Sequence, residues 1–445
     1  MLYKIPKSFI NELLINTNIV ELISSKINII KKGKNYYSIC PFHNEKTPSF
    51  SISFEKQFYY CFGCHVHGNA IDFLINYEKI NFIESIKELS FFSGMKIPKK
   101  NIYFKKYFKE ENLYNVLNKI SLTYQKNIYK EKNKIAIKYL QKRGINKKSI
   151  KIFSIGYSNN IKIISKNYIK KNKKFINNLI KSGILYNEKN NIKNRFTERI
   201  MFPIKNLKGN INGFGARTIL NKIPKYLNSP ETKIFKKTEN LYGLFEVYKY
   251  NKKIKRLLIV EGYFDVITLF QNKIKYAISI LGTSINIYII KKLFNICNTL
   301  IYCYDGDNAG KIASWKTLEI SLPYINDEKI LKFIFLPKGE DPDSIIKKEG
   351  IKKFKNRIKN AIPMSTLLFK KLLKKNDLSN PEKKTKFSRI AISMIEKIPG
   401  KIIKFFLKKI LGNKLGILEI NELNPNKIKN KFKISHKKKN KKILI

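Results

Sequence analysis

Five carboxylates stand at or just beyond the ends of three apolar runs. Leu-Leu-Ile-Val leads into Glu261, Leu-Ile-Tyr-Cys-Tyr leads into Asp305 and Asp307, and Phe-Ile-Phe-Leu-Pro precedes a loop with Asp341 and Asp343. Short apolar runs that alternate with polar, helix-like stretches predict a parallel α/β sheet buried on both faces. Because ligands of such sheets lie at the carboxyl ends of the strands, we expect these side chains to share one edge.

The chemistry that suits such a cluster is metal-assisted phosphoryl transfer. Like charges repel unless a cation neutralises them, and hard oxygen ligands select Mg²⁺ or Mn²⁺. Two such ions can hold both the attacking and the leaving oxygen of a phosphoryl transfer. A single acidic residue after a strand would mean little, but this chain has only 32 acidic residues against 90 Lys and Arg. Five at three strand ends therefore indicate a metal site.

A second group of metal-ligand residues lies near the amino terminus. Cys40 and His43 form a Cys-x2-His pair, and Cys61 and Cys64, after seventeen intervening residues, form a Cys-x2-Cys pair. Each pair is spaced to grip one side of a tetrahedral zinc ion, and four protein ligands make the site structural rather than catalytic.

Two alternatives remain for this region. The cysteines could be unrelated buried residues, although the spacing favours zinc. His65 and His67 are nearby rivals for a ligand position, and we interpret both as surface residues or as partners of the true ligands.

The formal net charge of +58 and the pI near 10.0 suggest a polyanionic partner such as a nucleic acid. The chain is saturated with Ile, Lys and Asn, so a compositional bias could supply much of the lysine. Charge by itself is therefore weak support for nucleic-acid binding, and basic residues at motif positions carry more weight.

Length and cysteine content limit the class of protein. A chain of 445 residues accommodates about three domains with real cores. Five cysteines are an odd number, which argues against a disulfide framework and for a reducing compartment. There is no signal peptide and no apolar stretch of the ~20 residues that a membrane span requires, so we expect a cytoplasmic protein without membrane contact.

The carboxylate region resembles the Toprim domain, which bacterial primases, topoisomerases and some nucleases share. The Glu-Gly start, the Asp-x-Asp pair and the later Asp-Pro-Asp all match. The resemblance implies that Glu261, Asp305 and Asp307 are the core magnesium-site residues, and that Asp341 and Asp343 complete the catalytic cluster.

The cysteine region resembles the zinc-binding domain of bacterial replicative DNA primases, the DnaG family. The matching blocks are Cys40-Pro-Phe-His-Asn-Glu-Lys-Thr-Pro-Ser-Phe50, Cys61-Phe-Gly-Cys64 and His67-Gly-Asn-Ala-Ile-Asp-Phe73. That family uses Cys, His, Cys and Cys as zinc ligands, and its zinc domain contacts the template DNA.

A third block, Pro224-Lys-Tyr-Leu-Asn-Ser-Pro-Glu-Thr232, resembles the basic segment beside the primase active site. The resemblance implies contacts with nucleic acid or nucleotide phosphates from this block and from its flanks. The candidate residues are Arg143, Arg195, Arg199, Lys225, Asn228 and Lys237.

We therefore expect a multidomain α+β protein: a zinc ribbon, a mixed α/β catalytic core with a Toprim parallel sheet, and a C-terminal helical subdomain. The expected parts are a zinc-binding domain at 1–100 with its ribbon at 36–69, a linker at 101–111, the basic part of the core at 112–250 with a curved antiparallel sheet, a Toprim domain at 255–343, a helical subdomain at 344–425, and a disordered basic tail at 426–445.

The implied function is that of a primase, which makes short RNA primers on single-stranded DNA from ribonucleoside triphosphates by two-metal nucleotidyl transfer. The implied cofactors are one structural Zn²⁺ and catalytic Mg²⁺ or Mn²⁺. A topoisomerase or nuclease is an alternative that also uses a Toprim domain, although no DNA-gate domain with a nucleophilic Tyr is evident. A non-catalytic zinc protein that binds nucleic acid is a third alternative. The loss of a core carboxylate would favour it, and none is lost.

We expect the usual docking domain for the replicative helicase to be missing, because the resemblance fades near residue 420 and the remainder is too short to bury a core. We expect that stable helicase docking has been lost and that the basic tail and the overall positive charge hold the protein on its template instead. The alternative is that the tail is a mutational remnant without a role.

Overall fold

The computed structural model describes residues 7–95, 102–159, 172–189, 191–220, 223–282, 285–375 and 378–416. The expected basic tail at 426–445, and the end of the expected helical subdomain from 417, lie outside the described residues. The chain divides into two units, Met1–Asn112 and Leu113–Ile445, and each is described by itself.

The first unit is built on a five-stranded antiparallel sheet whose strands follow chain order. Alternation explains its core: Phe50 and Ile52 are buried on β3, opposite Cys61 and Tyr59 on β4. The strands are β1 (Ile30–Lys32), β2 (Asn35–Ser38), β3 (Phe50–Ser53), β4 (Phe58–Cys61) and β5 (His67–Gly68).

Helices complete this core. Asn69 and Asn81 form capping boxes that start the third and fourth helices. The helices are α1 (Lys7–Ile15), α2 (Ile19–Ser24), α3 (Ala70–Tyr77) and α4 (Phe82–Phe92). The next helix, α5 (Ile102–Asn127), begins within the stretch that we expected to be a linker and continues into the second unit.

The second unit begins with helices around an antiparallel sheet of order β11-β10-β9-β6, in the region where we expected such a sheet. Its strands are β6 (Gly156–Ser158), β9 (Arg199–Lys205), β10 (Ile211–Thr218) and β11 (Tyr226–Asn228). A separate hairpin joins β7 (Leu185–Glu188) to β8 (Asn191–Asn194). The helices are η1 (Glu131–Asn133), α6 (Lys134–Lys142), α7 (Lys147–Ile152) and α9 (Lys173–Lys181).

A six-stranded sheet of order β12-β14-β13-β15-β16-β17 follows, with four parallel strands in the centre and an antiparallel strand at each edge. Its strands are β12 (Leu241–Tyr242), β13 (Arg256–Val260), β14 (Ala277–Ile280), β15 (Thr299–Tyr304), β16 (Ile330–Phe335) and β17 (Ile362–Pro363). The fold class expected from the sequence is confirmed.

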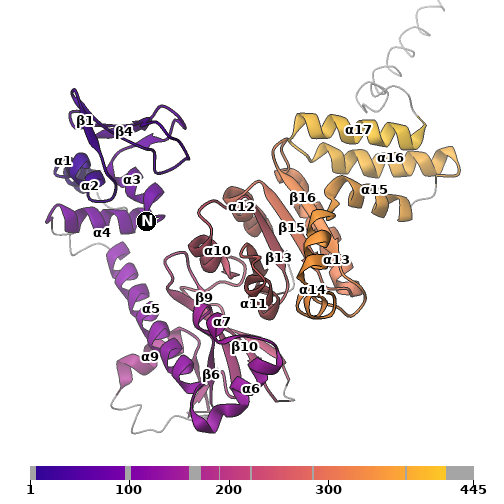
Figure 1. Cartoon of the computed structure of the whole chain (residues 1–445), viewed down its shortest axis with the longest axis horizontal. Helices are drawn as coiled ribbons and strands as arrows, with labels where there is room; N and C mark the ends of the chain where they lie inside the picture. The colour runs from indigo at the N-terminus through magenta and orange to yellow at the C-terminus, as the bar shows by residue number, and fades with distance from the viewer. Residues whose placement is uncertain are drawn as a thin grey trace, which may run out of the picture. The chain divides into compact units, whose positions relative to one another are not determined.

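Helices bury both faces of this sheet, which explains why its strands are apolar at consecutive positions (Figure 1). On β13, Leu258 and Val260 join the core that contains α11 and α14, whereas Leu257 and Ile259 join the core that contains α12 and α13. The helices are α10 (Leu244–Tyr250), α11 (Tyr263–Gln271), α12 (Ile287–Ile296), α13 (Asn308–Ser321), η2 (Leu322–Tyr324) and α14 (Pro342–Lys359).

Three further helices end the described chain: α15 (Met364–Lys375), α16 (Pro381–Glu396) and α17 (Lys401–Leu415). Leu368 of α15, Phe387 of α16 and Leu407 of α17 are buried in the core that also covers one face of the six-stranded sheet. Across the described ranges, none of the helices combines the length and the apolar character needed to span a bilayer.

Candidate active site and zinc site

The four predicted zinc ligands converge in the first unit. The ligand atoms of Cys40, His43, Cys61 and Cys64 all lie within 4.8 Å of one another. Cys40 Sγ is 3.8 Å from Cys64 Sγ, and Cys61 Sγ is 3.7 Å from His43 Nδ1. Zn–S bonds of about 2.3 Å at tetrahedral angles separate two sulfurs by about 3.8 Å, so the group has the dimensions of a zinc site.

Glu45 supports this group from outside, and sequence reasoning did not single it out. Its carboxylate lies 3.1 Å from His43 Nε2 and accepts a 2.6 Å hydrogen bond from the backbone N–H of Cys40. Although burial opposes it, hydrogen bonds from Ser49 and from Cys40 lower the pKa of Glu45. An ionised carboxylate on the far nitrogen of a ligating histidine fixes the ring and its tautomer.

The rival histidines have other contacts. The hydroxyl of Tyr60 lies 2.9 Å from His65 Nδ1, and His67 Nδ1 lies 2.9 Å from the carbonyl oxygen of His65. Neither histidine belongs to the four-ligand group.

In the second unit, the carboxylates lie at the carboxyl ends of the parallel strands. Glu261 follows β13, which is flanked by β14 on one side and β15 on the other, so it stands where the strand order reverses. Asp305 follows β15, and its backbone N–H donates a 3.2 Å hydrogen bond to Glu261 Oε1. Asp307 and Asp341 cap the amino termini of α13 and α14.

Gly306 holds two of these loops together. Its N–H donates a 3.0 Å hydrogen bond to the carbonyl oxygen of Glu340. A Cβ atom at Gly306 would stand 1.6 Å from the carbonyl oxygen of Pro337, a distance that no side chain could tolerate. Glycine at this position therefore lets the loop with Asp305 and Asp307 approach the loop that leads to Asp341.

The carboxylates repel one another. Burial, followed by the nearby carboxylates of Glu261 and Asp341, raises the pKa of Asp305 to about 7. Partial desolvation and the charge of Asp307 also raise the pKa of Glu261. Asp305 Oδ1 is buried and has no hydrogen-bond partner among the described residues. A cation would relieve both conditions.

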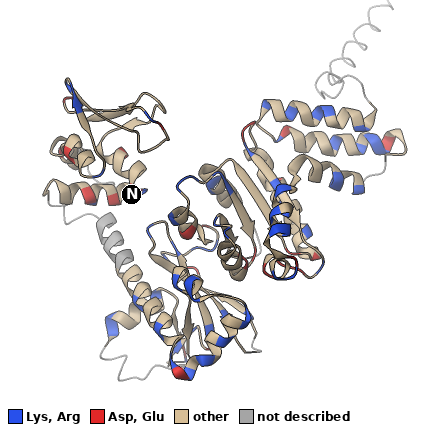
Figure 2. Ribbon diagram, in the orientation of Figure 1, with Lys and Arg blue, Asp and Glu red and all other residues tan. Residues whose placement is uncertain are grey.

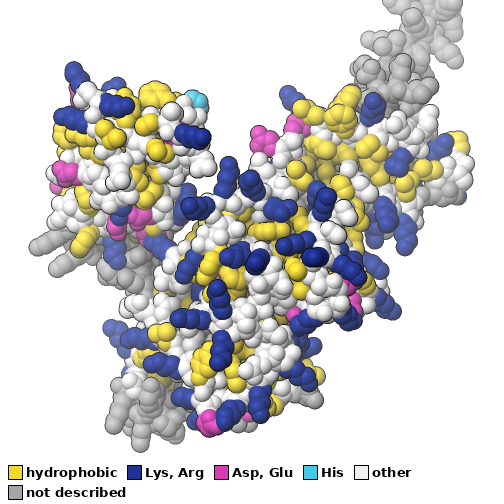
Figure 3. All heavy atoms as spheres, in the orientation of Figure 1, with side chains coloured by type: hydrophobic (Ala, Val, Ile, Leu, Met, Phe, Trp, Pro, Cys, Tyr) yellow, Lys and Arg dark blue, Asp and Glu magenta, His cyan; other side chains and the backbone are white. Residues whose placement is uncertain are grey.

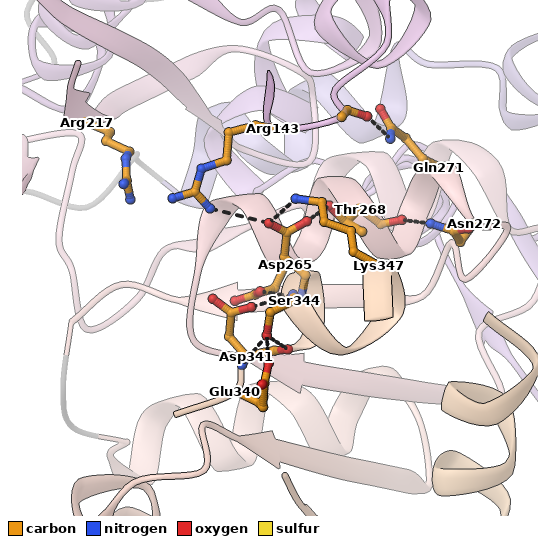
Figure 4. Close-up of polar contacts among 12 residues, drawn as sticks. Arg143, Arg217, Asp265, Thr268, Gln271, Asn272, Glu340, Asp341, Ser344 and Lys347 are labelled. Carbon is orange, nitrogen blue, oxygen red and sulfur yellow. Dashed lines mark hydrogen bonds and ion pairs between the residues drawn. The ribbon is translucent and has the colours of Figure 1, made fainter. Parts of the chain in front are cut away.

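Asp343 differs from the other four carboxylates because it already has cationic partners. Its Oδ2 lies 2.6 Å from Lys347 Nζ and 3.4 Å from Arg143 Nη1. Its Oδ1 accepts a 2.7 Å hydrogen bond from Thr268. In Figure 4, dashed lines from the labelled Arg143 and Lys347 mark these two contacts, and the carboxylate of Asp343 that they reach carries no label.

Asp265 belongs to the same network, although sequence reasoning assigned it no role. It is buried, and it accepts hydrogen bonds from the backbone N–H groups of Gly262 (2.9 Å) and Asp343 (3.1 Å). Burial, with added repulsion from Asp341 and Asp305, raises the pKa of Asp265 well above its usual range. The sequence signal that could have identified Asp265 is its position four residues after Glu261, on the first turn of α11.

A cleft of about 430 Å³ joins the acidic edge to basic residues of the antiparallel sheet. Arg217, which the sequence analysis did not select, is buried there, and its guanidinium lies 4.8 Å from the ring centre of Tyr226. Asn228 accepts a 2.5 Å hydrogen bond from the hydroxyl of Tyr263. The polar residues that line the cleft are Glu261, Asp265, Asp305, Asp341, Arg143, Arg217, Lys225 and Asn228, with Tyr226 and Tyr263.

The remaining basic candidates do not line the cleft. Arg199 is buried, and its guanidinium donates to the carbonyl oxygens of Pro224 (2.9 Å) and Lys225 (3.4 Å), so it positions this loop. Arg195 donates to the carbonyl oxygen of Gly183. Lys237 is half-buried, and its backbone N–H donates to Glu231. Figure 2 shows that Lys and Arg are spread over all parts of this unit, so their number alone did not locate the cleft.

Comparison with known proteins gives four family matches in chain order. They are the CHC2 zinc finger at residues 5–105, the DNA primase catalytic core N-terminal domain at 123–248, a Toprim-like domain at 258–346, and the DnaB-helicase binding domain of primase at 368–419. The match at 123–248 is specific to primases and decides against a topoisomerase, a nuclease or a non-catalytic protein.

The fourth match corrects the sequence analysis. We expected the helicase-docking domain to be absent, but its family match covers most of α15 and all of α16 and α17. The expectation was wrong because a helix that closes a catalytic core and a helix that docks a partner share the same amphipathic pattern. The hypothesis that the basic tail replaces helicase docking loses its basis.

Individual relatives agree with these matches. The DNA primase of Buchnera aphidicola subsp. Baizongia pistaciae is 52% identical over 439 residues, which cover 96% of this chain and 74% of that protein. A solved structure of the DnaG primase catalytic domain bound to ssDNA has a TM-score of 0.68 and 41% identity, covering 71% of this chain and 99% of that one. The Aquifex aeolicus primase structure, with zinc-binding and RNA polymerase domains, has a TM-score of 0.59 and 31% identity, covering 93% of this chain and 98% of that one. The chain belongs to the bacterial DNA primase family of the DnaG type.

Proposed function

We propose that the acidic and basic walls of the cleft form the site where this primase joins ribonucleotides on a single-stranded DNA template. One observation carries the assignment: the carboxylates of Glu261, Asp305 and Asp341 line the same cleft as Arg143, Arg217 and Lys225. A polymerase needs such a pairing, because it must bind both divalent cations and the phosphates that they accompany.

Glu261, Asp305 and Asp307 would hold Mg²⁺ or Mn²⁺, with Asp341 beside them. The donor set fits, because carboxylate oxygens are the ligands that these hard cations prefer. The buried, unpartnered Asp305 Oδ1 and the raised pKa of Asp305 also fit, since both describe a site that lacks positive charge. When bound, such ions lower the pKa of a primer hydroxyl and neutralise charge on the pyrophosphate leaving group.

The basic wall would bind nucleotide and template phosphates. The guanidinium of Arg217 lies against the ring of Tyr226, and that of Arg143 lies 5.0 Å from the ring centre of Phe264. Aromatic packing fixes these groups before a ligand arrives, which lowers the entropic cost of binding. Lys225 is exposed at the rim and has no partner side chain among the described residues, so it can meet a phosphate there.

The other parts would support this reaction. One structural zinc ion at Cys40, His43, Cys61 and Cys64 would maintain the fold of the first unit, which we propose contacts the template. The helices that match the helicase-binding family would dock a DnaB-type helicase.

Primer synthesis on bare single-stranded DNA tests the assignment. We expect Asp305→Asn to reduce synthesis at least 100-fold while template affinity stays within about threefold, because the substitution removes a metal ligand and no phosphate contact. Glu319→Gln, on the exposed side of the adjacent helix α13, is the matched control and should leave synthesis unchanged. Near-normal synthesis by Asp305→Asn would place the active site elsewhere.

A further inference from the structure

Helix α17 is apolar on two opposite sides. Leu407, Leu411 and Leu415 are buried against the rest of the second unit. On the other side, four large apolar residues at helical spacing form what we call the outer face: Ile402, Phe405, Phe406 and Ile410. A helix that needed only to cover the core would carry polar residues on its outer face.

The outer face is accessible to solvent. Ile402 is 62% exposed, Phe405 51%, Phe406 53% and Ile410 37%. The two phenylalanine rings contact each other edge to face, with centroids 5.7 Å apart. Figure 3 shows apolar side chains gathered on the visible face of the C-terminal helices, with Lys and Arg side chains near them.

The neighbouring helix α16 shows that this pattern is not general in the subdomain. Its exposed positions are polar or charged, among them Lys383, Lys386, Arg389, Ser393 and Glu396. Scattered exposed apolar side chains are normal, but a continuous apolar stripe on one helix marks an interaction surface.

We propose that the outer face of α17 is the surface that docks the replicative helicase. This rests on the docking role proposed above for the helices that match the helicase-binding family, and the outer face lies inside that matched segment. Phenylalanine side chains seated in a partner's pockets are typical anchors of such interfaces.

The charge of the side chains next to the outer face indicates what the partner surface must carry. Lys401, directly before Ile402, and Lys409, one turn after Phe405 and Phe406, are exposed and supply the positive charge of this surface, which we call its basic rim. A complementary partner presents an apolar groove bordered by acidic side chains. A second copy of this chain has the same basic rim and would be repelled, so a helicase surface is the better occupant.

The test measures binding of the full-length chain to the purified DnaB-type helicase of the same organism. We expect Phe405→Ser/Phe406→Ser to weaken binding at least about tenfold, since truncating central anchors commonly has effects of this size. Ile402→Lys, a second variant on the outer face, should act in the same direction. Phe91→Ser/Phe92→Ser, another pair of adjacent exposed phenylalanines, on α4, is the control and should bind as the unaltered chain does.

Primer synthesis without helicase shows whether a variant is folded and active. Together with the binding measurement, it distinguishes a failure of the docking role from a failure of the outer face as the docking surface. Both variants of the outer face should prime on bare single-stranded DNA at the normal rate. If the unaltered chain does not bind helicase, the docking role itself is refuted. If it binds and the outer-face variants bind equally well, docking occurs elsewhere and only this inference fails. An outer face that instead mediates self-association, seen as dimers lost in Phe405→Ser/Phe406→Ser, would also overturn it.

Discussion

Arg143 and Asp343 are 200 residues apart in the sequence, and their side chains meet at 3.4 Å beside the cleft that we propose as the active site. Asp343 is buried and is also bonded to Thr268 and Lys347. The contact ties the loop after α6 to the first turn of α14. Asp343 therefore positions the guanidinium of Arg143, which lines the cleft, and both of its own carboxylate oxygens already have partners.

The first prediction separates this positioning role from metal binding. Asp343→Asn should raise the KM for nucleotide roughly tenfold, because a loosened Arg143 no longer stands in place to meet a phosphate. The Mn²⁺ affinity, measured by calorimetry, should change little. If Asp343→Asn loses Mn²⁺ as completely as Asp305→Asn does, Asp343 is a metal ligand after all.

The second prediction concerns stability without divalent ions. Asp305→Asn should raise the melting temperature of the chelator-treated protein at pH 8 by a few degrees, because it removes a partly buried charge that faces other carboxylates. Added Mn²⁺ should stabilise the unaltered protein and not this variant. Equal stabilisation of both by Mn²⁺ would argue against a metal site at Asp305.

The third prediction concerns the glycine between Asp305 and Asp307. Gly306→Ala should abolish primer synthesis, since its methyl group cannot fit against the carbonyl oxygen of Pro337 and must push the two loops apart. Gly339→Ala is the control from the same region: it has open space around it, and its positive φ costs only about 1–2 kcal/mol. Activity that survives Gly306→Ala would show that the loops can separate without harm.

The fourth prediction concerns zinc. Elemental analysis should find about one zinc per chain by the four-ligand count, and Cys61→Ser should lose both the ion and the fold of the first unit. Glu45→Gln should weaken zinc binding by about 10- to 100-fold, because His43 loses its ionised partner. His65→Gln, the control outside the ligand group, should retain full zinc, and a zinc loss there would reopen the ligand assignment.

The fifth prediction distinguishes two basic residues that the sequence treated alike. Lys225→Gln should weaken template or nucleotide binding and reduce its salt dependence, since this lysine lines the cleft. Arg195→Gln should have a smaller effect, because Arg195 bonds Gly183 and lies 5.2 Å from the ring centre of Tyr186. Titrations over a range of salt concentrations would decide, and equal losses would contradict the placement.

Several features of this protein follow from the sequence alone. The spacing of Cys40, His43, Cys61 and Cys64 is a local property, because two short knuckles grip one ion wherever the rest of the chain lies. The apolar runs before Glu261 and Asp305 predicted parallel strands, because only residues buried on both faces are apolar at consecutive positions. Strand ends then placed these carboxylates at one edge.

The tertiary structure decided which charged groups are free to bind a ligand. Asp305 and Asp343 look alike in sequence, yet one has an unpartnered buried oxygen and the other has three partners, Thr268 among them. Lys225 lines the cleft, whereas Arg195 already donates a hydrogen bond to Gly183. The spacing of apolar residues on α17 likewise did not distinguish its outer face from its buried face. The physical reason is that periodicity records which residues share a side of an element, whereas partners and exposure depend on segments distant in the chain.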